Sequence, residues 1–119
     1  MGFTVARIDE LPGEGPGSAV RFLRRALGAT AFGLNHFTLA PGAQGLEHDE
    51  SCSGQEEVML VLEGSGVLLV EGEEVDLAPG VAVRIDPATT RCPVAGQDGL
   101  VFVTIGAPRT GPYVPRGPF

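Results

Sequence analysis

The sequence predicts an all-β fold, an antiparallel sandwich or small barrel built from about eight short strands. The chain of 119 residues contains 18 Gly and 10 Pro, which divide it into short elements joined by turns. Between these turns apolar residues alternate with polar ones, as in Val81, Val83 and Ile85, which would share one face of a strand. A chain of this length forms one domain around a single core.

Residues 1–29 are expected to precede the main sheet as a strand, a loop and one short N-terminal helix. The strand covers residues 3–8 and the Gly-rich loop covers residues 9–19. Val20, Leu23 and Leu27 have helical spacing, and Gly28 provides a stop, so residues 20–28 are predicted as a helix, with a strand as the alternative.

Residues 30–106 are predicted to form the barrel. Its expected turns are the following: Pro41-Gly42, Gly64-Ser65-Gly66, Glu71-Gly72-Glu73, Pro79-Gly80 and Asp98-Gly99. They separate strands within 30–42, a meander over 56–80, a strand over 81–87 and a hairpin over 92–106. Residues 107–119 carry four prolines and are expected to be an extended tail.

Charge and composition limit the partners. The net charge of −7 repels phosphate backbones, so no nucleic acid is expected as a partner. The longest apolar run is strand-sized and the N-terminus does not resemble a signal peptide, so no membrane association is expected. Cys52 and Cys92 have neither a Cys-x-x-Cys nor a zinc-type spacing, and two free thiols indicate a reducing, cytoplasmic location.

Two segments resemble the paired motifs of the cupin family, whose members are small jelly-roll barrels. The first family motif is Gly, five residues, His-x-His, a short gap, Glu, six residues and Gly. Gly42, His48, Glu57 and Gly64 match it. The second motif is Gly, five residues, Pro-x-Gly, two residues and His. It aligns with Gly80, with Asp86-Pro87-Ala88 and with Arg91.

The resemblance implies a candidate metal site of His48, Glu50 and Glu57, with Arg91 at the fourth ligand position. The family's ion would be divalent, with Mn, Fe, Ni and Zn as candidates. Glu50 replaces a histidine by an oxygen ligand, but a guanidinium has no lone pair to donate. Arg91 could therefore neutralise Glu57 or Glu50 in place of the ion.

Alternatives remain open for three of these residues. Glu50 lies either on a solvated loop or inside the barrel, since strand boundaries read from sequence are uncertain by ~2–4 residues. His48 is either a ligand or a polar residue at the rim of a pocket. His36 is interpreted as an ordinary strand residue, with its face undetermined.

Three classes of function are compatible with these residues. The first is a barrel that binds a small molecule, with anions among the candidates, in a pocket of His48, Glu57, Met59 and Arg91. The alternative is a divalent-metal-dependent enzyme of dioxygenase or isomerase type using His48, Glu50 and Glu57. The third is an accessory protein in stress or regulation, with the barrel as scaffold.

A homodimer is also expected. Residues 3–8 and the tail, with Val114 and Phe119, have no evident partner within the chain, and cupins commonly pair through such segments.

Overall fold

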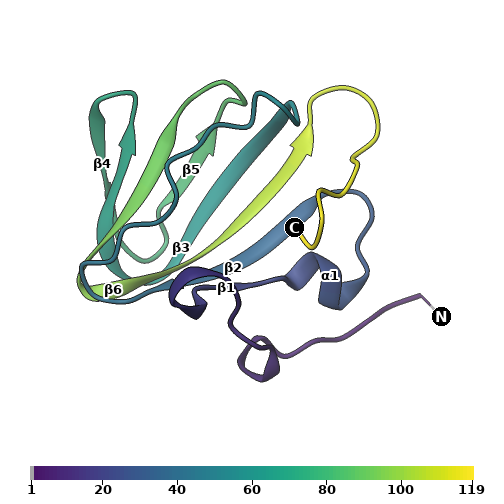
Figure 1. The fold of residues 1–119 in the computed structure, drawn as a ribbon, viewed down its shortest axis with the longest axis horizontal. Coiled ribbons are helices and arrows are strands. Elements are labelled where there is room, and N and C mark those ends of the chain that lie inside the picture. Colours follow the sequence, from purple (N-terminus) through teal and green to yellow (C-terminus); the bar gives the residue numbers. More distant parts are fainter. Residues whose placement is uncertain (1) are drawn as a thin grey trace.

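The computed structural model describes residues 2–119 and confirms an antiparallel, mostly β fold of jelly-roll type (Figure 1). The strands are β1 (Val20–Arg21), β2 (Gly33–Leu39), β3 (Gln55–Val70), β4 (Glu73–Leu77), β5 (Ala82–Ile85) and β6 (Arg91–Pro108). The helices are α1 (Leu23–Leu27) and the 3-10 turns η1 (Ile8–Glu10) and η2 (Pro16–Ser18). No helix among residues 2–119 has the length and apolar character needed to cross a membrane.

Two long strands, β3 and β6, organise the fold. They pair with each other along most of their length, with register shifts between Val61 and Glu63 and between Gly64 and Gly66. The first half of β3 also pairs with β5, and its second half pairs with β4. The later part of β6 pairs with β2, which in turn pairs with β1. Each long strand therefore contributes to two layers, and Figure 1 shows both strands bending at the lower left. The first layer contains β1, β2, β5, the first half of β3 and the later part of β6. The second layer contains β4, the second half of β3 and the start of β6.

The hydrophobic core lies between the two layers. Its buried members alternate with exposed positions along each strand, as period-2 geometry requires. Phe37 and Phe102 stack with their ring centroids 4.9 Å apart. The buried cluster contains Leu39, Met59, Val61, Leu68, Leu77, Ile85, Ala95, Leu100 and Phe102.

Glycines allow the bend, and two of the predicted turns are wrong for this reason. Gly64-Ser65-Gly66 lies inside β3 and Asp98-Gly99 lies inside β6. A Cβ on Gly64 would lie 2.1 Å from the carbonyl oxygen of Gly99. The glycines at these two positions therefore indicate the close approach of two bent strands, and not a reversal of the chain.

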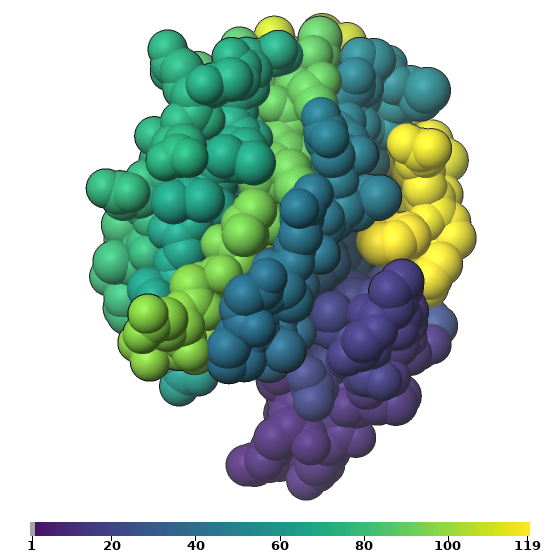
Figure 2. Space-filling view, turned by 60° about the vertical axis from the view of Figure 1, so that its left-hand side comes forward, coloured from purple at the N-terminus to yellow at the C-terminus, as the bar shows by residue number. Residues whose placement is uncertain are grey.

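The barrel is not closed by strand pairing. The described strands follow the open order β1-β2-β6-β3-β4, with β5 attached to β3, so the strand pairing leaves sheet edges open. One edge of the second layer is covered instead by the segment 42–50. It forms isolated bridges through Gln44 and His48 to the start of β6. In Figure 2 this blue segment runs diagonally beside the green start of β6.

The N-terminal region differs from its prediction in two respects. Residues 3–8 form no strand: they are extended without a pairing partner, and Ile8 begins η1. Residues 20–28 are divided between β1 and the five-residue helix α1, because β1 pairs with β2. Gly28 ends α1 in the left-handed conformation, as predicted.

From Arg109 onward the Pro-rich tail has no regular structure, as predicted, although Ala107 and Pro108 belong to β6. The tail does have a partner within the chain. The Tyr113 hydroxyl donates a hydrogen bond to the Phe119 carbonyl at 2.8 Å. The Phe119 ring packs edge-to-face on Phe22 at 5.0 Å. Tyr113 is buried and Phe119 is half exposed, so the tail closes over α1.

The bend provides the first prediction. Gly64 has φ +81°, and Gly72, in the β3–β4 turn, has φ +82° with nothing within 4 Å of a Cβ. Alanine at either position costs ~1–2 kcal/mol for the left-handed conformation, but only Gly64→Ala adds a clash with β6. We expect Gly64→Ala to lower the free energy of unfolding by about 2 kcal/mol more than Gly72→Ala, measured by urea denaturation. Equal losses would contradict close strand contact at the bend.

Candidate functional site

Arg91 is the most deeply buried charged side chain of the site, with 1% of its surface exposed. Its Nη2 donates to Glu57 Oε1 at 3.0 Å, and its Nη1 donates to the Thr89 carbonyl at 2.9 Å. Its Nε is buried without a hydrogen-bond partner among residues 2–119. The guanidinium charge is therefore neutralised mainly by one carboxylate, through a charge-assisted hydrogen bond.

Backbone pairing places these groups together. Arg91 is the first residue of β6, where it faces Val70 in the second layer. Glu57 lies near the start of β3, between Ile85 of β5 and Gly106 of β6, in the first layer. Since both long strands bend, their two ends return to the same side of the molecule, and the ion pair joins one layer to the other (Figure 1).

His48 reaches the site through a two-way backbone bridge to Arg91. The His48 amide donates to the Arg91 carbonyl at 3.0 Å, and the Arg91 amide donates to the His48 carbonyl at 2.9 Å. The His48 side chain is one-third exposed, so it lies at the rim and not in the core.

Glu50 forms a second ion pair with His48. The distance from His48 Nε2 to Glu50 Oε2 is 3.3 Å, and Ser53 Oγ donates to Glu50 Oε1 at 2.9 Å. The hydrogen bond that His48 donates to the Glu50 carboxylate raises the pKa of His48, against the opposing effect of burial. The same hydrogen bond lowers the pKa of Glu50. Glu50 is therefore half-buried and oriented, not a freely solvated loop residue.

The two ion pairs influence one another. The positive charge of Arg91 lowers the pKa of both His48 and Glu50, and the charge of Glu57 raises that of His48. With His48 protonated, two cations balance two carboxylates at the site. The arrangement can bind polar groups by hydrogen bonding, and its net charge changes with the protonation of His48.

These residues do not fit a resident divalent ion. Arg91 holds Glu57 through Nη2, and a guanidinium is a donor without a lone pair. His48 and Glu50 are paired with each other. Within residues 2–119, no group of three or more His, Cys, Asp or Glu side chains could hold a metal ion.

The remaining predicted residues lie elsewhere. Met59 is 3% exposed and belongs to the core cluster below Glu57 on the same face of β3. His36 lies on the opposite face of the first layer, since it is paired with Val103 while Phe37 and Phe102 face the core. Whether His48, Glu57, Met59 and Arg91 bind a ligand stays a prediction.

Two contributors were missed by the sequence analysis. Thr89 acts through its carbonyl oxygen, for which no side-chain pattern exists. Ser53 follows Glu50 by three residues, a spacing at which a hydroxyl can return to the carboxylate within one turn, and this signal was available.

Two surface grooves lie outside this cluster. One, of about 690 Å³, lies beside the N-terminal segment, His36 and Leu62. The other, of about 330 Å³, lies between Cys52 and the Pro-rich tail. Of the residues that contact the two ion pairs, only Ser53 lines either groove.

Solved structures similar to this one share its fold. A cupin protein from Bacteroides fragilis is 20% identical, with a TM-score of 0.78, covering 98% of this chain and 92% of that one. A predicted oxalate decarboxylase from Thermotoga maritima is 20% identical, with a TM-score of 0.69 and coverages of 87% and 97%. A sugar phosphate isomerase of the cupin superfamily from Silicibacter pomeroyi is 25% identical, with a TM-score of 0.71 and coverages of 90% and 76%.

Sequence comparison assigns the family independently of the fold. No curated protein matches the sequence. The profile of the Cupin domain family, Cupin_2, matches residues 35–106, which include both predicted motifs and more than half of the chain. This chain belongs to the cupin family.

Proposed function

We propose that this cupin binds a small polar molecule at the end of the fold where His48, Glu50 and Glu57 are partly exposed, and that it does so without a resident metal ion. The observation that carries the proposal is the buried ion pair of Arg91 with Glu57. Arg91 stands at the position where the family motif has its last histidine. The guanidinium supplies there the positive charge that an ion would otherwise supply.

Small acids are the class of ligand that we propose. With His48 neutral, Arg91 faces two carboxylates and the site carries an excess negative charge. Protonation of His48 removes this excess, so an anion binds best together with a proton. The names of two similar proteins, a predicted oxalate decarboxylase and a sugar phosphate isomerase, denote enzymes of small anions and guide the choice of probes.

The metal-dependent enzyme remains the weaker candidate. It requires Glu57 to coordinate an ion, and Glu57 already accepts a hydrogen bond from Arg91. No observation on His48 or Glu50 favours the metal-dependent enzyme, because these two side chains form an ion pair with each other.

The second prediction tests the ligand class. We expect oxalate or a sugar phosphate to raise the melting temperature of the protein, and a neutral sugar of the same size not to. The affinity of the acid, measured by calorimetry, should fall as pH rises through the raised pKa of His48. His48→Gln should abolish this pH dependence. Binding of the neutral sugar alone, or no binding of either acid at millimolar concentration, would contradict the proposal.

The third prediction concerns the ion pair. Arg91→Ala should lower the free energy of unfolding by about 3 kcal/mol, because Glu57 loses the partner that neutralises it in a largely buried position. Arg84→Ala is the matched control. Like Arg91, Arg84 forms an ion pair with a glutamate of β3, here Glu56, but it does so from β5 and at the exposed surface. We expect little change for this control in the same urea titration.

Arg91→His provides the second arm of this test, because it replaces the guanidinium by a ring nitrogen that can ligate. We expect Mn²⁺ or Ni²⁺ to raise the melting temperature of Arg91→His and not that of the unmodified protein. Equal stabilisation of both proteins would show that Arg91 does not exclude the ion.

The fourth prediction concerns pH and the pair of His48 with Glu50. The folded pKa of His48 is raised above 6.5, so its contribution to stability is complete below pH 6.5 and is lost as pH rises through the raised value. The folded pKa of Glu50 is lowered below 4.5, so its contribution is present above pH 4.5 and is lost as pH falls through the lowered value.

The two contributions therefore coincide between pH 4.5 and 6.5. We expect His48→Gln to destabilise the protein most in this window, by at most ~1 kcal/mol because the pair is partly exposed. The measurement is the free energy of unfolding in urea at several pH values. A loss that does not change with pH would contradict the pairing.

A further inference from the structure

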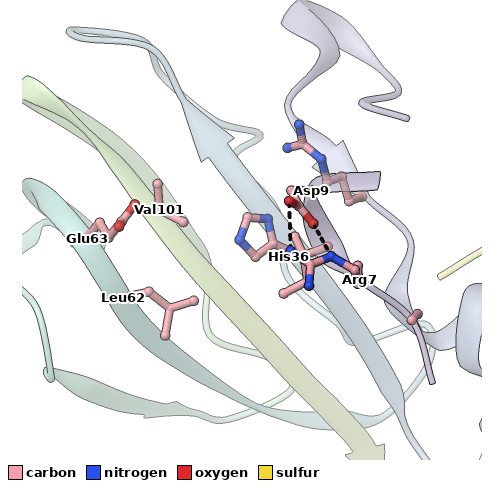
Figure 3. Close-up of a pocket in the computed structure, with 9 residues that line it drawn as sticks. Arg7, Asp9, His36, Leu62, Glu63 and Val101 are labelled. Atoms are coloured by element: carbon pink, nitrogen blue, oxygen red, sulfur yellow. Dashed lines mark hydrogen bonds and ion pairs between the residues drawn. The ribbon is translucent and has the colours of Figure 1, made fainter. Parts of the chain in front are cut away.

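The larger surface groove, of about 690 Å³, lies on the outer face of the first layer, beside the N-terminal segment. In Figure 3, His36 of β2 lies between that segment and two residues of β3, Leu62 and Glu63. No residue that contacts the two ion pairs around Arg91 lines this groove. A ligand bound here would therefore be bound independently of the site proposed above.

A β-bulge turns Glu63 toward this groove. In the pairing of β3 with β6, Val61 lies opposite Phe102 and Glu63 lies opposite Val101, so Leu62 is an extra residue in β3. Regular alternation from the buried Val61 would direct Glu63 into the core. The bulge instead places both Leu62 and Glu63 on the exposed surface. Bulges often re-aim a side chain in this way next to a functional site.

Two opposite charges of the groove, Arg21 and Glu63, form no ion pair with any of residues 2–119. Arg21 donates through Nε to the Leu11 carbonyl at 3.2 Å, which holds the guanidinium near the N-terminal segment. Arg7 and Asp9 neutralise each other, with Arg7 Nη2 at 3.2 Å from Asp9 Oδ2. The groove therefore presents one cation and one anion that can pair with a ligand.

His36 lies between these two charges. The strand order β1-β2-β6-β3 places Arg21 on one side of it and Glu63 on the other. The His36 side chain is 7% exposed, and its Nδ1 is buried without a hydrogen-bond partner in the described part of the chain. Burial and then the charge of Arg21 lower the pKa of His36, while the charge of Glu63 raises it. The neutral ring has one donor and one acceptor nitrogen, and its capacity for hydrogen bonding is not used up within this chain.

We propose that this groove binds a small zwitterion of the size of an apolar dipeptide. The carboxylate of the ligand pairs with Arg21, its ammonium group pairs with Glu63, and its peptide group forms a hydrogen bond with the ring of His36. Two arginines and two carboxylates give the groove no net charge, which suits a ligand that is itself neutral overall. The apolar side chains of the ligand pack on the apolar residues of the lining, Ile8, Leu62 and Val101.

The separation of the two charges favours a dipeptide over a single amino acid. Neighbouring strands lie ~4.8 Å apart, so the backbones at Arg21 on β1 and Glu63 on β3 are separated by ~14 Å. A dipeptide spans ~7 Å, and the long side chains of arginine and glutamate can cover the remainder. In a free α-amino acid the ammonium and carboxylate groups share one carbon, which places them too close together to meet both partners.

Titration with the dipeptide leucyl-valine, followed by NMR of the histidine rings, tests the location of the site. The chain contains two histidines, and the variant His48→Gln identifies the signals of each. We expect leucyl-valine at millimolar concentration to shift the ring signals of His36 and to leave those of His48 unchanged. Oxalate, a probe for the site at Arg91, should do the reverse, so that either proposal can fail without the other.

Two outcomes of this titration overturn the proposal. One is an unchanged His36 ring at millimolar leucyl-valine, as would occur if a second copy of the chain covered the groove. The other is a shift of the His48 ring alone, which would place the dipeptide at the two ion pairs.

Variants at the two charges test the contacts, with affinity for leucyl-valine measured by calorimetry. We expect Glu63→Gln to weaken binding at least ~10-fold. Glu74→Gln, the same change at an exposed position of β4, should have no effect. Arg21→Gln should weaken binding as much as Glu63→Gln does, and Arg116→Gln, at an exposed position of the tail, should not.

Blocked dipeptides test the same contacts on the unmodified protein, which matters because Arg21→Gln also removes the hydrogen bond to the Leu11 carbonyl. Leucyl-valinamide lacks the carboxylate and acetyl-leucyl-valine lacks the ammonium group, so we expect each to bind at least ~10-fold more weakly than leucyl-valine. Equal affinity of the free and blocked dipeptides, or equal losses in Glu63→Gln and Glu74→Gln, would overturn the proposal, because the ligand would then contact neither charge.

Discussion

The buried positive charge of Arg91 is the constraint on which the end of the fold with the candidate site depends. A guanidinium with 1% exposure must be neutralised nearby, and Glu57 is the carboxylate that its Nη2 contacts. The side chain of Arg91 thereby holds the first half of β3, while its backbone holds the segment 42–50 through His48. One residue joins both layers and the covering segment, which is why the candidate site and the architecture cannot be separated.

The same constraint determines what chemistry the site can perform. Glu57, the carboxylate that would coordinate an ion, accepts a hydrogen bond from Arg91. His48, beside it, forms an ion pair with Glu50. What remains accessible is a rim of hydrogen-bonding groups whose charge depends on one proton at His48. These features are the basis of the proposed reversible binding of small polar molecules, in which protonation of His48 takes part in the binding equilibrium.

Much of the fold could be predicted from the sequence, because alternation and family motifs are local or nearly local signals. The same motifs and the charge of Arg91 predicted an ion pair with Glu57 or with Glu50, and the structure has it with Glu57. The errors arose where a local signal has two physical causes. Gly64 and Gly99 indicate a turn in isolation, but here they permit two bent strands to touch. Residues 3–8 have the alternation of a strand and no strand partner in their own chain, and pairing cannot be read from one strand's sequence. The pairing of His48 with Glu50 depended on where the loop 50–54 places its oxygens, which strand boundaries leave undetermined.

Elemental analysis of the protein, purified without chelator and without a metal-affinity column, tests most directly whether Arg91 takes the place of the ion. We expect no divalent metal in stoichiometric amount, and full retention of the fold after dialysis against chelator. A stoichiometric divalent ion that chelator removes with loss of stability would contradict it, because Glu57 would then have to leave Arg91 to coordinate the metal.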